Sequence, residues 1–205
     1  CECGRCRGMS PSDQALFATN ILAEVLAEAA PGARIAHLAY HDTLLPASVV
    51  SPGGNVSLLF APRERCYAHA INDSSCERNV PDYWEPLLGL IPLFGNDPAR
   101  VDVFEYYSDA ILFKWLAPPL LDVQAADSAA YAGAGAGNLQ NLMVSPRPWM
   151  GPPWHAWWMA RCSWTAGMAA DAALSHFCPA AYPAHAEEMA RYYQEQERAY
   201  CLILD

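Results

Sequence analysis

The apolar and polar positions predict helices that alternate with short buried strands over the first two thirds of the chain. The clearest helix spans 10–31, where Ser10 suits the N-cap, Pro11 suits the first helical position, and apolar residues recur at helical spacing. Three short apolar segments lack a polar face, which is typical of strands buried on both sides. These predicted strands are 34–40, 56–60 and 101–107.

Weaker signals extend the same alternation toward the C-terminus. The further predicted segments are helices over 83–93 and 118–131, a strand over 133–144, and helices from 154 to 204. Strands that alternate with helices indicate a parallel α/β sheet, either open or closed into a barrel. A complete eight-stranded barrel takes about 250 residues, whereas only four strand-helix units fit here. We therefore predict half a TIM-type barrel over 1–145, followed by a helical region over 146–205.

Composition and charge narrow the class of protein. Of the 205 residues, 53% are hydrophobic, which is enough to bury a core. Twelve Lys and Arg against 22 Asp and Glu give a formal net charge of −10, which disfavours a nucleic-acid partner. No apolar run reaches the roughly 18 uncharged residues of a membrane helix. Because the chain begins at Cys1 rather than Met, we expect it to be cut from a longer protein.

Cysteines form two candidate groups for a metal. Cys1, Cys3 and Cys6 have a spacing that suits one tetrahedral ion, such as a structural zinc, if a fourth ligand comes from elsewhere. Residues of the loop after the second strand are candidates for that ligand, and we expect them to approach the N-terminus: Cys66, His69 and Cys76. Spacing leaves metal binding, disulfides and reduced thiols open. The remaining cysteines lie in apolar helical surroundings and are interpreted as packing residues: Cys162, Cys178 and Cys201.

One glycine-rich stretch superficially resembles a nucleotide-binding loop. In 133–137, however, the third glycine of GxGxxG would fall at Asn138, and the stretch follows a helix rather than a strand. We interpret these glycines as small residues that permit close packing. The chain also has no GxxxxGK[ST], HExxH or GxSxG motif. The sequence therefore lacks the usual markers of phosphate transfer, zincin proteolysis and α/β-hydrolase chemistry.

Polar residues gather where the three predicted strands end, which is where α/β barrels place their active sites. They are Tyr40, His41 and Asp42 after the first strand, Arg63, Arg65, Tyr67 and His69 after the second, and Glu105, Tyr106, Tyr107 and Asp109 on the third. Carboxylates, tyrosines and arginines around one mouth suit a polyhydroxylated ligand, because sugar hydroxyls both donate and accept hydrogen bonds. The sequence therefore predicts a glycan site.

Roles within this site can be assigned by chemistry. Glu105 and Asp42 are the candidate catalytic carboxylates, and we expect Glu105→Gln to fold while losing glycan hydrolysis. The other residues named at the strand ends are candidate substrate ligands, with Arg63 or Arg65 gripping a carboxylate or hydroxyls. Four tryptophans offer either a platform for sugar rings or core packing. They are Trp149, Trp154, Trp157 and Trp158.

Several motifs together resemble one bacterial barrel family. They are Cys-x-Cys-x-x-Cys at 1–6, Leu38-Ala-Tyr40 with Pro46 beyond, Arg65-Cys-Tyr-Ala-His69 with Cys76 and Asn79, and Phe104-Glu-Tyr-Tyr107. The family is a domain of unknown function, is related to alpha-glucuronidases, and includes endo-beta-N-acetylglucosaminidases that act on N-glycans. The resemblance runs in order from residue 1 to about residue 140, and the helical remainder is similar to the region after the barrel.

The resemblance implies that the chain is the C-terminal half of a (β/α)8 barrel, with roughly strands five to eight. It implies a periplasmic or extracellular glycoside hydrolase for complex or acidic glycans, which releases oligosaccharides containing N-acetylglucosamine and needs no cofactor for catalysis. The N-terminal half of the barrel would be the partner. An essential carboxylate would then precede Cys1, so the chain alone is expected to be inactive. The alternatives are a non-catalytic glycan-binding scaffold and a structural metal module built on the N-terminal cysteines.

Overall fold

Four parallel strands form one sheet in the order in which they occur along the chain. They are β1 (Ile35–Ala39), β2 (Val56–Phe60), β3 (Val101–Asp109) and β4 (Asn138–Val144). The structure is a computed structural model, and it describes residues 1–4, 6–114, 117–144 and 154–204. Register pairs Ile35 with Val56, Leu58 with Val101 and Asp102 with Asn138.

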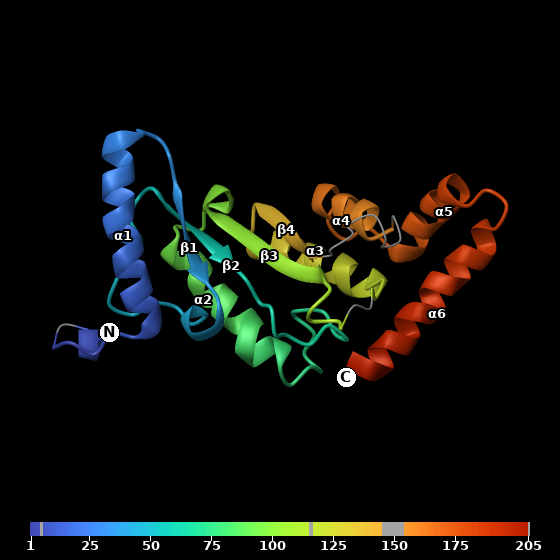
Figure 1. The fold of residues 1–205 in the computed structure, drawn as a ribbon, viewed down its shortest axis with the longest axis horizontal. Coiled ribbons are helices and arrows are strands. Elements are labelled where there is room, and N and C mark those ends of the chain that lie inside the picture. Colours follow the sequence, from blue (N-terminus) through green and yellow to red (C-terminus); the bar gives the residue numbers. More distant parts are fainter. Residues whose placement is uncertain (5, 115–116, 145–153, 205) are drawn as a thin grey trace.

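Helices connect the strands and then continue beyond the sheet. They are α1 (Pro11–Ala29), α2 (Glu85–Leu93), α3 (Leu121–Ala134), α4 (Trp154–Trp164), α5 (Ala170–Ala181) and α6 (Ala186–Leu204). Short helical turns are η1 (Cys6–Gly8), η2 (His41–Thr43), η3 (Val80–Trp84) and η4 (Pro98–Arg100). The predicted fold class is confirmed: a parallel α/β sheet with the arrangement of a partial barrel precedes a set of helices (Figure 1).

Two predicted boundaries shift for local reasons. The helix predicted from residue 118 begins at Leu121, because Leu120 before it has a left-handed backbone with φ of 45°. That helix continues to Ala134 and ends at Gly135, whose φ of 103° is readily adopted by glycine. The fourth strand therefore begins at Asn138 rather than at residue 133.

α1 is fixed to the sheet by its first turn. Ser10 and Asp13 form a capping box, and the carboxylate of Asp13 also accepts the backbone N–H groups of Ser48, Val49 and Val50 at 2.8–2.9 Å. Although burial raises the pKa of Asp13, these hydrogen bonds hold it well below its usual range. One buried carboxylate thus joins the start of α1 to the loop that follows β1.

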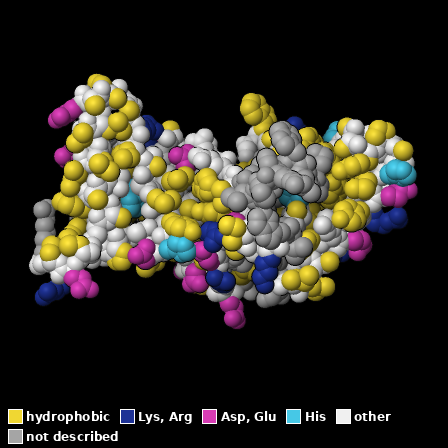
Figure 2. All heavy atoms as spheres, viewed as in Figure 1, with side chains coloured by type: hydrophobic (Ala, Val, Ile, Leu, Met, Phe, Trp, Pro, Cys, Tyr) yellow, Lys and Arg dark blue, Asp and Glu magenta, His cyan; other side chains and the backbone are white. Residues whose placement is uncertain are grey.

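The two faces of β1 differ in their cover. His37 and Ala39 are buried, and the His37 ring stacks on Phe94 after α2 at 6.4 Å between centroids. On the opposite face, Leu38 is 46% exposed. Hydrophobic side chains are also exposed along α1 and the neighbouring part of the sheet (Figure 2), among them Ile21, Leu22 and Val25. The helices therefore cover one face of this strand and leave the other open.

The C-terminal helices enclose a second core. Trp154 and Trp158 are fully buried, and Trp154 packs against Phe177 and Tyr193 of α5 and α6. This confirms the core interpretation of these two tryptophans, so they form no platform for sugar rings; Trp157 is partly buried beside them. Trp149 and the predicted boundary between residues 145 and 146 lie outside the described residues.

The helices α4, α5 and α6 each carry one of the cysteines that the sequence predicts to be packing residues. Cys162 and Cys178 are buried in the second core as predicted, whereas Cys201 is only half-buried. Among the described residues, none of the helices combines the length and the apolar character required to cross a membrane.

Candidate functional site

The carboxyl ends of β1, β2 and β3 bring predicted site residues together in two layers. Because parallel strands end at the same edge of a sheet, residues far apart in sequence meet there. An outer cluster consists of Tyr40, His41, Arg63, Glu64, Tyr106 and Asp109, of which Tyr106 and Asp109 are buried and the others are at least partly exposed. A buried network lies beneath it and consists of Arg65, Tyr67, Glu105, Tyr107, Asp127 and Tyr131.

Arg63 organises the outer cluster. Its Nε and Nη2 both contact Oδ2 of Asp109, at 2.9 and 2.8 Å, and its Nη1 donates to Glu64 at 3.2 Å. Asp109 is almost fully buried, while the Arg63 side chain keeps 23% of its surface exposed. Asp109 also accepts the backbone N–H groups of Ile111 and Leu112. The guanidinium is therefore held from one side and remains accessible from the other.

Two tyrosines lie beside this arginine. The rings of Tyr40 and Tyr106 are nearly parallel with centroids 6.4 Å apart, and the guanidinium carbon of Arg63 lies 5.8 Å from the centroid of the Tyr106 ring. Burial raises the pKa of Tyr106 to about 12, so its hydroxyl stays protonated at neutral pH. The outer cluster thus combines aromatic faces, a hydroxyl donor and a guanidinium.

Two carboxylates are more exposed at the rim of the outer cluster. Oε2 of Glu64 lies 3.5 Å from Nδ1 of His41. The Glu64 side chain is partly exposed, and the His41 side chain is about half exposed. Asp42, a predicted catalytic residue, is exposed on η2 next to His41. The sequence prediction did not include Glu64, although its position between Arg63 and Arg65 was a usable signal.

Arg65 is the centre of the buried network. Its side chain is fully buried; Nε donates to Glu105 at 3.0 Å, and Nη2 donates to Asp127. Its Nη1 donates to the carbonyl oxygens of Cys66 and His69 at 3.1 and 3.2 Å. These bonds occupy the guanidinium within the protein. The expectation that Arg65 contacts a ligand is therefore wrong for this structure, and of the two arginines only Arg63 reaches the surface.

Glu105 is equally enclosed. Its Oε1 accepts hydrogen bonds from Arg65 and from the Tyr131 hydroxyl, and its Oε2 accepts from the Tyr67 hydroxyl and the Tyr106 N–H, each at 3.2 Å. Four donors leave no free oxygen lone pair for the proton that a general acid must carry. We therefore correct the expected role of Glu105: in this structure it is a buried partner of Arg65, and its carboxylate does not reach the surface.

The sequence prediction missed two residues of this network, Asp127 and Tyr131. Asp127 lies on α3 and accepts from Arg65, from the Ile71 N–H at 2.6 Å and from the Tyr107 hydroxyl at 2.9 Å. Burial raises its pKa to about 6, and the Glu105 charge raises it as well, whereas Arg65 lowers it. The only signal in the sequence was Asp127 and Tyr131, four residues apart on an alanine-rich helix.

The predicted substrate ligands thus divide among three places. Tyr40, His41, Arg63 and Tyr106 belong to the outer cluster. Tyr67 and Tyr107 belong to the buried network, where burial raises the pKa of both phenols well above the usual value. His69 lies instead beside a thiol, with 3.3 Å between its Nδ1 and Sγ of Cys66.

The cysteines of the two candidate metal groups come together as two separate sets. Cys66 and Cys76 lie close to each other, as predicted, in one set with His69; the other set is Cys1, Cys3 and Cys6. The terminal amino group donates to Oε1 of Gln14 and the Gln14 amide donates to the Cys6 carbonyl, which ties the N-terminus to α1. The loop after β2 lies away from that end of the molecule (Figure 1). The expectation of a shared ion is therefore wrong.

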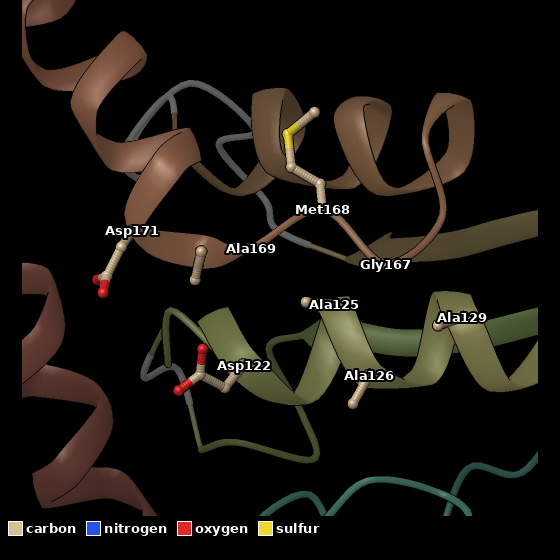
Figure 3. Close-up of a pocket in the computed structure, with 9 residues that line it drawn as sticks. Asp122, Ala125, Ala126, Ala129, Gly167, Met168, Ala169 and Asp171 are labelled. Atoms are coloured by element: carbon tan, nitrogen blue, oxygen red, sulfur yellow. The ribbon is translucent and has the colours of Figure 1, made fainter.

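A shallow pocket elsewhere has no part in this site. It has a volume of about 420 Å³ and lies between α3 and the segment that joins α4 to α5 (Figure 3). Alanines of α3 form its floor, while Asp122 and Asp171 lie at one end. None of its lining residues belongs to the outer cluster or to the buried network.

Comparison with known proteins gives one match. Residues 1–195 match the family described as a domain of unknown function, DUF4838. No curated protein and no solved structure matches the chain.

Proposed function

The chain belongs to the DUF4838 family, and from the geometry of its strand ends we propose that it forms part of a glycoside hydrolase for complex or acidic glycans. The observation that carries this proposal is the outer cluster itself. Tyr40, Tyr106 and Arg63 lie side by side at the carboxyl ends of three parallel strands, with exposed carboxylates at the rim.

The chemistry of the outer cluster suits a sugar. Tyrosine rings offer flat apolar faces to the C–H faces of a pyranose, and their hydroxyls donate to its oxygens. The exposed edge of the Arg63 guanidinium matches a carboxylate, such as that of an acidic sugar, or a pair of adjacent hydroxyls. Buried Asp109 and the rim residue Glu64 both hold the arginine in place, so little side-chain entropy is lost when a ligand binds.

Hydrolysis needs a proton donor at the leaving oxygen, and Asp42 is the exposed carboxyl group proposed for that role. For a substrate with an N-acetyl group, the acetamido oxygen would bond to the anomeric carbon while the bond to the leaving oxygen breaks. The carboxyl proton would pass to the leaving oxygen, and water would then open the cyclic intermediate. The hydroxyls of Tyr40 and Tyr106 are proposed to orient the acetamido group. Glu105 supports this site only indirectly, because it accepts the Tyr106 N–H.

A complementary barrel half is the proposed partner. Leu38 is exposed on the uncovered face of β1, and Ile21, Leu22 and Val25 are exposed on α1. Within the described sheet, β1 and β4 are edge strands. Four further strands with their helices would cover these apolar surfaces, pair both edges and supply catalytic groups that this chain lacks. We propose a periplasmic or extracellular location for the assembled enzyme.

A non-catalytic glycan-binding scaffold is the second candidate function. It is favoured by one observation: arginines engage Glu64, Glu105 and Asp109, which are three of the four carboxylates described at these strand ends; the fourth is Asp42. Such a module would bind glycans through the same tyrosines and Arg63 without cleaving them.

Hydrolysis of an N-glycan by the protein with both barrel halves tests the proposal, with oligosaccharide binding measured by calorimetry in parallel. We expect Asp42→Asn to abolish turnover while binding is retained. Binding without any turnover by the wild-type protein would favour the scaffold. If neither binding nor turnover is found with neutral and acidic glycans, the proposed function is wrong.

A further inference from the structure

The loop between β2 and η3 brings two thiols and an imidazole to one point. Sγ of Cys66 lies 3.3 Å from Nδ1 of His69, and Sγ of Cys76 completes a group whose ligand atoms all lie within 4.8 Å of one another. A tetrahedral zinc ion, with Zn–S bonds of about 2.3 Å and Zn–N bonds of about 2.0–2.1 Å, holds a sulfur and a nitrogen ligand about 3.5 Å apart. The separation of Sγ of Cys66 from Nδ1 of His69 is therefore close to that in a formed site.

We propose that Cys66, His69 and Cys76 bind one zinc ion, with the fourth tetrahedral position left to water or another donor. Two thiolates and one imidazole are a donor set that selects zinc over magnesium or calcium, which prefer oxygen ligands. Cys76 is buried whereas Cys66 and His69 are partly exposed, so an ion can enter from the solvent side.

Asn79 contacts all three ligand residues, through the backbone of Cys66 and His69 and through the sulfur of Cys76. It is fully buried, its Oδ1 accepts the Cys66 N–H at 2.8 Å, and its Nδ2 donates to the carbonyl oxygens of Cys66 and His69 at 2.9 and 3.1 Å. Its own N–H points to Sγ of Cys76 at 3.4 Å. An N–H donor to sulfur stabilises a thiolate, and such outer contacts orient metal ligands.

Arg65 supports the backbone of two of the ligand residues, Cys66 and His69. Its Nη1 donates to the carbonyl oxygens of Cys66 and His69, while Asp127 accepts the N–H of Ile71 two residues further along. The loop is thus anchored to the sheet and to α3 at both sides of His69. Three ligand-bearing residues are held in place before any ion binds, which lowers the entropic cost of closing the site.

The ion would have a structural effect on the glycan site without entering it. Cys66 directly follows Arg65, and Arg63 of the outer cluster lies near the start of the loop that carries the ligands. Closing this loop on zinc would limit the motion of both arginines. The proposal concerns the loop alone and does not depend on the reaction proposed above.

A disulfide between Cys66 and Cys76 is the competing arrangement. It would require neither His69 beside the thiol nor the Asn79 N–H at the second sulfur, and both are found. The two arrangements predict different results with metal and with thiol reagents, so one set of measurements separates them.

Cobalt and zinc titrations of the purified chain test the site. The starting protein carries Cys1→Ser, Cys3→Ser and Cys6→Ser, because those thiols form the second metal-capable group. We expect it to bind one equivalent of Co²⁺ with the strong visible bands of a tetrahedral thiolate site, and Zn²⁺ to displace the cobalt. His69→Ala in this background should remove the tetrahedral bands. Since His69 is partly exposed, that variant is expected to fold, and circular dichroism verifies it.

Cys201→Ser is the matched control, because Cys201 is half-buried on α6 and outside the site; it should leave the cobalt spectrum unchanged. Zinc should also raise the melting temperature of the starting protein and not that of His69→Ala. Absence of tetrahedral bands in the starting protein, or their persistence in folded His69→Ala, overturns the proposal. So does a Cys66–Cys76 disulfide found by mass spectrometry in protein purified without reductant.

Discussion

Nε of Arg65 donates to Oε1 of Glu105 over 3.0 Å, with both side chains fully buried. The two residues lie 40 positions apart in the chain, Arg65 in the loop after β2 and Glu105 within β3. A buried pair of this kind offers weak evidence for net stabilisation, but removing one of its charges unbalances the network. Without the Glu105 charge, Arg65 keeps only Asp127 as a buried counter-charge, and without the Arg65 charge both carboxylates lose their cation. The pair therefore determines how substitutions in the centre of the molecule will behave.

Glu105→Gln is expected to destabilise the fold. The amide keeps the size of the side chain but loses the charge opposite Arg65. Its NH₂ group replaces one carboxylate oxygen and cannot accept the two hydrogen bonds made to that oxygen. We expect the free energy of unfolding to fall by about 3 kcal/mol, measured by urea denaturation. Glu28→Gln, on the exposed face of α1, should change it little. Normal stability together with lost glycan turnover would instead restore Glu105 as a catalytic residue.

Arg63→Ala should weaken glycan binding, and it should also lower the free energy of unfolding because the buried Asp109 carboxylate loses its cation. The Arg63 side chain is partly exposed, and its removal takes away the donor edge that faces the solvent. We expect the dissociation constant to rise at least about tenfold, because hydrogen bonds to a charged group contribute about 1.5–3 kcal/mol. Calorimetry with an acidic oligosaccharide measures it. Arg198→Ala, at an exposed ion pair on α6, is the control and should bind normally; equal affinity in both variants would remove Arg63 from the site.

Glu197 should make stability depend on pH. Burial raises the pKa of its carboxyl group from 4.5 to about 7, although its side chain accepts the Asp122 N–H. Between these values the folded chain retains a proton that the unfolded chain releases, so the free energy of unfolding falls as pH rises through this range. We expect Glu197→Gln to reduce that fall by on the order of 2 kcal/mol. Denaturation at pH 5 and pH 8 measures the difference, and identical slopes in wild type and variant would contradict it.

Gly137→Ala should be strongly destabilising. A Cβ at this position would collide with the carbonyl oxygen of Pro98 and lie 2.7 Å from its carbonyl carbon, while the Gly137 N–H donates to Val101 at 2.9 Å. We expect a loss of about 2 kcal/mol or more, in the range of overpacking substitutions. Gly133→Ala, in α3 with open space around it, should instead be neutral or stabilise by about 0.5–1 kcal/mol. Thermal unfolding of both variants provides the comparison.

The Gly137 contact also shows where sequence reasoning succeeded. The glycine-rich stretch was interpreted as packing, since its spacing and position did not fit a nucleotide loop, and the close approach to Pro98 confirms that interpretation at Gly137. The elements themselves were predictable for a similar reason. Apolar runs, the Ser10 cap and the glycine and proline breaks each determine local structure within a few residues, so they can be recognised from the sequence alone.

The sequence by itself determined the alternation of helices and parallel strands and the polar chemistry at the strand ends. Only the tertiary structure decided which of those polar residues face solvent. Glu105 and Tyr107 point toward α3, where Glu105 accepts from the Tyr131 hydroxyl and the Tyr107 hydroxyl donates to Asp127. Tyr106 instead faces Tyr40 and Arg63. Arg65 meets Asp127 across 62 positions of sequence, a pairing that no local pattern encodes. Burial is a property of the assembled layers, because a side chain loses water only when distant elements close over it.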